Sequence, residues 1–78
     1  MSRKSDLKKA IAESEKEIED LEKKRTRSQS ALLEAFINHT TPSEKDAEYF
    51  RVFTSLIALE RENLINLKDE LAELEGKD

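Results

Sequence analysis

The chain has 78 residues, of which 41% are charged and 5% aromatic, with one Gly, one Pro and no Cys. A composition so poor in turn and strand formers favours long helices or a coiled coil, and the lack of cysteine excludes disulfides, thiolate nucleophiles and cysteine-ligated zinc. The formal net charge of −4, from 18 acidic and 14 basic residues, predicts no strong attraction to nucleic acid or to an anionic membrane.

The first predicted helix covers residues 5–39. Ser5 or Asp6 can cap its N-terminus, and Asp6 also suits the positive end of the helix dipole. Residues spaced alternately by three and four form its seam: Leu7, Ile11, Ser14, Ile18, Leu21, Arg25, Ser28, Leu32 and Ala35. The helix should stop near Asn38 or His39, because a residue before proline is pushed out of the α region.

The second predicted helix covers residues 42–75, after a turn at 40–41. Thr41 can act as N-cap, Pro42 suits the first helical position, and Glu44 suits a capping box. Its heptad seam has Phe50, Ile57, Leu64 and Leu71 at a, and Phe53, Glu60, Leu67 and Leu74 at d. Gly76 is expected to end the helix in the left-handed conformation.

So short a connection predicts an all-α fold, a single antiparallel two-helix hairpin over residues 1–78. The alternative is one continuous helix bent at Pro42. Folding about residues 40–41 brings Ser14 near Leu67 and sets Arg25 within reach of Glu60. We expect Arg25 and Glu60 to pair and to specify the register. The competing interpretation is that both charged groups extend past the seam into solvent.

Apolar residues spread beyond the seam in the half nearest the turn. They predict an association surface, because a large apolar patch on a lone hairpin usually marks an interface. A homodimer that forms a four-helix bundle is the simplest way to cover the patch. The predicted interface consists of Leu32, Leu33, Phe36, Ile37, Tyr49, Phe50, Val52, Phe53, Leu56, Ile57 and Leu59.

Two polar signals suggest other functions. The basic cluster of Lys23, Lys24, Arg25 and Arg27 could contact phosphates, but acidic residues flank it and no aromatic residue is interleaved to stack on bases. A solvated helix flank is the preferred interpretation. His39 is the single histidine and lacks a second ligand at helical spacing, which favours an interaction with the helix dipole over metal binding.

These features predict a non-enzymatic protein–protein interaction module: a self-associating hairpin that acts as an adaptor, small chaperone or assembly factor. The partner is a second copy or a helical protein. One alternative is a nucleic-acid-binding regulator that uses the basic cluster, and another is an inhibitor that docks on another protein. No cofactor, metal, small molecule or membrane is expected as a partner. The N-terminus becomes polar before a signal peptide could form, which predicts a cytoplasmic location.

Overall fold

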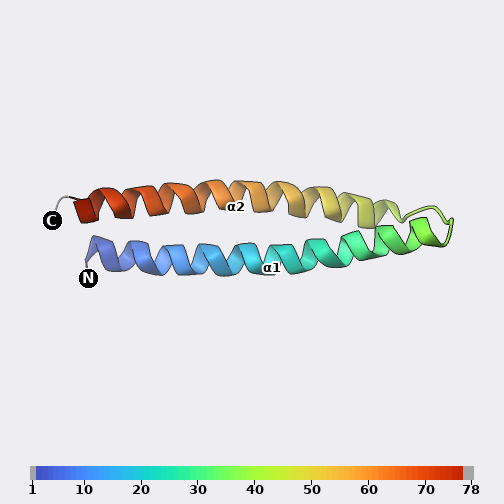
Figure 1. The fold of residues 1–78 in the computed structure, drawn as a ribbon, viewed down its shortest axis with the longest axis horizontal. Helices are drawn as coiled ribbons and strands as arrows, with labels where there is room; N and C mark the ends of the chain where they lie inside the picture. Colours follow the sequence, from blue (N-terminus) through green and yellow to red (C-terminus); the bar gives the residue numbers. More distant parts are fainter. Residues whose placement is uncertain (1, 77–78) are drawn as a thin grey trace.

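Two long helices make up the fold in the computed structural model, which describes residues 2–76. Helix α1 covers Arg3–Ile37 and helix α2 covers Glu44–Gly76. They run antiparallel, side by side, with the N- and C-terminal ends at one end of the rod and the connection at the other (Figure 1). The rod measures 60 × 16 × 16 Å. The predicted antiparallel hairpin is confirmed; residues 1, 77 and 78 of the predicted domain lie outside the described residues.

Helix α1 begins earlier than predicted, because Ser2 caps it in place of Ser5 or Asp6. Ser2 is extended, with φ −91° and ψ 154°, and its Oγ accepts a hydrogen bond from the Ser5 amide at 3.0 Å. This is the usual N-cap arrangement, in which a short side-chain oxygen satisfies an amide of the first turn. Asp6 follows within the first turn, where its charge favours the positive end of the dipole.

Helix α1 ends in a Schellman motif whose left-handed residue is His39. Its φ is +54°, the one positive value among the non-glycine residues that the structure describes. The His39 amide donates to the Phe36 carbonyl at 3.2 Å, and the Thr40 amide donates to the Ala35 carbonyl at 2.9 Å. These two bonds satisfy carbonyls that the helix end would otherwise leave without a donor.

Helix α2 begins two residues later than predicted. The first helical bond joins the Ala47 amide to the Ser43 carbonyl at 3.1 Å, so Ser43 holds the N-cap place predicted for Thr41. Pro42 therefore lies in the connection and not at the first helical position. At the other end, Gly76 is the last residue of α2 and does not have a positive φ, so its predicted left-handed role is also wrong.

The core is a narrow seam between the two helices, where the predicted heptad positions lie. Ile57 is 1% exposed and is the most deeply buried large side chain. Two buried serines share the seam, and both are satisfied. Ser14 Oγ donates to Glu60 Oε1 at 2.7 Å, while Ser28 Oγ donates to the Lys24 carbonyl of its own helix at 3.4 Å.

The register of the seam differs from the predicted one. Folding about residues 40–41 was expected to set Ser14 near Leu67, but the structure sets it against Glu60. The Glu22–Arg61 contact lies close to its predicted level, so the mean of the two contacts offsets the helices by about one turn from the prediction. The connection is the cause: it covers residues 38–43 and not 40–41, and its left-handed residue redirects the chain.

Neither described helix contains a stretch apolar enough to span a membrane.

Candidate association surface

Seven of the predicted interface residues are exposed in the hairpin. They are Leu33, Phe36 and Ile37 of α1 and Tyr49, Val52, Leu56 and Leu59 of α2. Phe36 is the most exposed, at 78%. The other four predicted residues lie within the hairpin: Leu32, Phe50 and Phe53 are half-buried, and Ile57 is buried. Ile57 therefore already has its contacts inside the hairpin.

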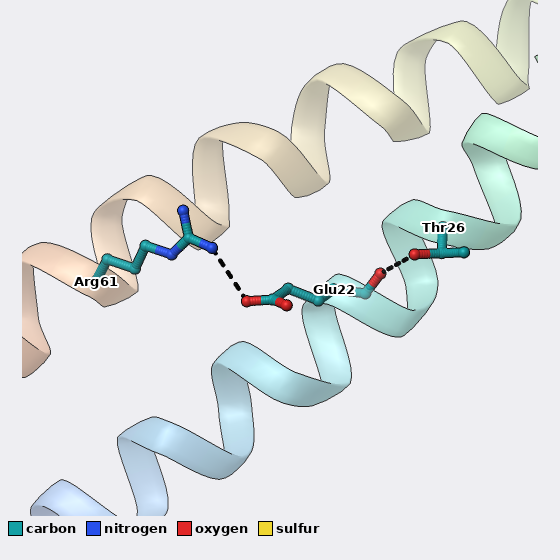
Figure 2. Close-up of polar contacts among 3 residues, drawn as sticks. All are labelled: Glu22, Thr26 and Arg61. Carbon is teal, nitrogen blue, oxygen red and sulfur yellow. Dashed lines mark hydrogen bonds and ion pairs between the residues drawn. The ribbon is translucent and has the colours of Figure 1, made fainter.

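The hairpin has two broad faces, and each of them carries a cross-helix ion pair. On the first face, Arg61 donates to Glu22 Oε1 at 3.1 Å, and Figure 2 shows the two side chains meeting between α2 and α1. In the same view, the Thr26 hydroxyl donates to the Glu22 carbonyl at 2.9 Å. On the second face, Arg3 of α1 pairs with Glu70 of α2. We call these the Arg61 face and the Glu70 face.

Most of the exposed apolar residues of α2 belong to the Glu70 face. Leu56 lies two heptads before Glu70 and therefore projects from the same side of α2, and Tyr49 lies one heptad before Leu56. Val52 and Leu59 are each three residues from Leu56 or Tyr49 and continue the row. We call Tyr49, Val52, Leu56 and Leu59 the α2 stripe. Together they form a continuous apolar surface about three turns long.

Two of the exposed apolar residues of α1, Leu33 and Phe36, lie on the other side. Phe36 is two heptads after Glu22, so it belongs to the Arg61 face, and Leu33 is three residues before Phe36. The predicted surface is therefore not one continuous patch. It is divided between two faces, because the apolar residues flank the seam on opposite sides of the two helices.

Aromatic stacking connects the α2 stripe to the seam. The rings of Tyr49 and Phe53 lie one turn apart on α2, with centroids 5.9 Å apart and planes 27° apart. Phe53 is half-buried against α1, so it orients the Tyr49 ring. Offset aromatic pairs of this kind contribute about 0.5–1.5 kcal/mol. The stripe is thus supported at its turn end by a residue packed in the seam.

The predicted register pair is not formed in the described part of the chain. Glu60 Oε1 accepts from Ser14 and, at 3.1 Å, from Asn63 Nδ2, while Arg25 is half-buried on the seam without an ion pair. The one-turn offset explains this, since it carries Glu60 away from the turn. Glu60 still makes a polar contact across the seam, but its partner is the Ser14 hydroxyl and not the Arg25 guanidinium.

The basic cluster does not form a single surface. Arg25 lies on the seam, half-buried, whereas Lys23, Lys24 and Arg27 are exposed. Lys23 Nζ pairs with Glu19 Oε1 at 3.2 Å within α1, and both side chains are two-thirds exposed. The cluster is therefore dispersed around the helix, and one of its charges is already compensated by a neighbour.

One exposed apolar residue is missing from the sequence prediction. Ile65 is 58% exposed and lies four residues after Arg61, on the Arg61 face. It belongs neither to the seam nor to the α2 stripe, so helical spacing offers no signal for it. An isolated exposed apolar residue is ordinary on a protein surface.

Within the described residues, no group of three or more acidic, histidine or cysteine side chains is placed to hold a metal ion, and no pocket forms. His39 is exposed in the connection, at the left-handed position described above.

Comparison with known proteins finds no match: no family model, no curated protein and no solved structure is similar enough to the chain to be matched.

Proposed function

We propose that the chain is a non-enzymatic protein–protein interaction module, a helical hairpin that associates with itself and acts as an adaptor, small chaperone or assembly factor. The observation that supports this most is the α2 stripe. Its four residues are neighbours on the surface of α2, at spacings of three and four, and their side chains are 41–64% exposed. Continuous apolar surfaces of this kind usually mark an interface, whereas isolated apolar residues do not.

The shape of the hairpin supports the same proposal. The rod is only 16 Å across, so no further layer of the described chain covers the α2 stripe, whose residues stay exposed. A second layer of helices would shelter the stripe, as in bundles that bury an apolar side on each helix.

A charge in the stripe tests the proposal. Leu56→Asp should convert the associated form into a monomer, because it places an unpaired carboxylate in the buried centre of the interface. The matched control is Ile65→Asp, the same change at an exposed branched residue of the same helix but on the Arg61 face. This variant should stay associated.

The measurement is molar mass by light scattering during size-exclusion chromatography, repeated across a wide dilution series. If Leu56→Asp keeps the mass of the parent at every concentration, the stripe is not the association surface. If the parent itself is a monomer throughout, self-association is wrong, and the stripe is left to a helical segment of another protein.

A further inference from the structure

The Glu70 face combines the apolar α2 stripe with a charged row on α1. Glu17 and Lys24 lie two and three heptads after Arg3, so they project from the same side of α1. Residues three or four positions away complete the row, which consists of Glu13, Glu17, Asp20, Lys24 and Arg27. The row is acidic in its first part and basic in its second. We call it the α1 row.

One acidic and one basic side chain of the α1 row have charges available for a partner. Glu17 and Arg27 are exposed. Within the described residues, neither takes part in the ion pairs that hold the hairpin.

Two contacts establish which residues of the helices lie level with each other. Ser14 is bonded to Glu60, and Glu22 is bonded to Arg61. The mean position of the two contacts is residue 18 on α1 and between residues 60 and 61 on α2, so Ile18 lies about level with Glu60.

The change of charge in the α1 row lies level with the α2 stripe. The helices run in opposite directions, so four residues forward along α1 correspond to four residues back along α2. Moving forward from Ile18 reaches the midpoint between Asp20 and Lys24, and moving back from Glu60 reaches Leu56. A single two-fold axis at this level can therefore act on both helices.

From this coincidence we infer that two copies pack Glu70 face to Glu70 face in antiparallel orientation, with their turns at opposite ends. The axis sets α2 against α2 of the second copy, with Leu56 beside its own equivalent and Val52 beside Leu59. It also sets α1 against α1, with Glu17 beside Arg27 and Asp20 beside Lys24 of the second copy. The inference rests on the proposed self-association and adds the face and the orientation.

The opposite arrangement, with both turns at the same end, does not match the charges. It places α1 of the second copy over α2, and the α2 stripe then covers Asp20, Lys24 and Arg27. Removing these charges from water against apolar side chains is costly unless each is paired. The antiparallel arrangement instead sets Val52, Leu56 and Leu59 of the two copies against one another, with Tyr49 level with Asn63, and it sets acidic residues beside basic ones.

Complementary charge reversals test the arrangement. Glu17→Lys alone sets lysine beside Arg27 in both halves of the dimer, and Arg27→Glu alone sets glutamate beside Glu17. Each variant should dissociate about tenfold more readily, since two pairs worth up to about 1 kcal/mol each change from attraction to repulsion. An equimolar mixture of the two should regain the parent's affinity, because every pair in the mixed dimer is again opposite in charge.

The mixture separates contacts between copies from contacts within one hairpin. Glu17 and Arg27 are ten positions apart on one helix and do not touch, so only pairing between copies can restore the affinity of the mixture. Dissociation constants come from sedimentation equilibrium in dilute salt, and circular dichroism checks that each variant keeps its helicity. A mixture no tighter than the single variants would overturn the antiparallel pairing.

The distance between the connections of the two copies gives an independent test of their relative orientation. The chain lacks cysteine, so Thr41→Cys allows one spin label in each exposed connection. Ile37, the last residue of α1 before the connection, lies 15 positions beyond the axis level, which is about 22 Å along the helix. The second copy extends equally far on the other side of the axis, so the two labels should be roughly 45 Å apart. A dimer with labels within roughly 20 Å would overturn the orientation and leave self-association standing. A monomer at every concentration would overturn both.

Discussion

His39 holds a backbone position that glycine usually takes. At φ +54°, its Cβ is crowded against the following carbonyl, which costs a non-glycine residue about 1–2 kcal/mol. Histidine is among the residues that tolerate this region better than most. The surrounding bonds of the helix end hold the strain in place. The single histidine therefore has a structural place at the end of α1.

Replacing this residue should change stability in opposite directions. His39→Gly should raise the free energy of unfolding by about 0.5–1 kcal/mol, because glycine enters the left-handed region without a steric cost. His39→Val should lower it by at least about 1 kcal/mol, because a branched Cβ is least compatible with positive φ. Urea unfolding followed by circular dichroism, at one protein concentration, measures both. Equal stability of the two variants would contradict the role given to His39.

The two buried serines of α1 differ in what they bond. The Ser14 hydroxyl crosses the seam to a carboxylate, whereas the Ser28 hydroxyl returns to a carbonyl of its own helix. Ser14→Ala should cost about 1–2 kcal/mol of unfolding free energy, since Glu60 loses a charge-assisted bond in a half-buried place. Ser28→Ala should be neutral or slightly stabilising, because alanine is the better helix former. Denaturant midpoints compare the pair directly, and a larger loss at Ser28 would reverse this assignment.

At the scale of the elements, each helix has one apolar seam and a group of exposed apolar residues on one flank of it, with Ile65 isolated on the other flank of α2. On α2 the flank is the α2 stripe; on α1 it is the group near Phe36. Antiparallel helices bring like heptad flanks together across the seam. The α2 stripe and the group near Phe36 occupy unlike flanks of their helices, so they belong to opposite faces. The pairs Glu22–Arg61 and Arg3–Glu70 follow this geometry. Exposed ion pairs of this kind contribute only about 0–1 kcal/mol each, so the seam provides most of the helix–helix stability.

Two isoleucines of α2 allow the stability contributed by the seam to be compared with that contributed by the surface. Ile57→Ala should lower the free energy of unfolding by about 2–4 kcal/mol, because Ile57 is 1% exposed and leaves a cavity between the helices. Ile65→Ala should change it by about 0.5 kcal/mol or less, because that side chain is mostly in water. Thermal unfolding of both variants at matched concentration tests the contrast. A comparable loss at Ile65 would show that its face is covered in solution.

At the scale of the molecule, the hairpin is a rod two helices thick. Burial is limited to one seam, and the α2 stripe outside it is exposed on one face. A partner that binds only the folded hairpin stabilises it by mass action. Folding and association should therefore be coupled in this chain.

The coupling predicts a melting temperature that depends on concentration. Raising the protein concentration to a hundred times the dissociation constant stabilises the folded dimer by about 2.7 kcal/mol, and the melting temperature should rise accordingly. Leu56→Asp should melt at a lower temperature that does not change on dilution. Differential scanning calorimetry at several concentrations gives both curves. A parent melting temperature that is constant over that range would contradict coupled association.

The sequence by itself determined the two helices, their antiparallel hairpin and the residues of the seam. It could do so because threes-and-fours spacing specifies a helical face, and a proline after a short polar stretch separates two helices. Only the tertiary structure decided the register, the partner of Glu60 and the division of the apolar residues between two faces. A heptad seam repeats along its length, so a slip of one turn still sets apolar residues against apolar residues. The choice among such registers depends on the backbone of residues 38–43, where one histidine in the left-handed region determines how α2 returns along α1.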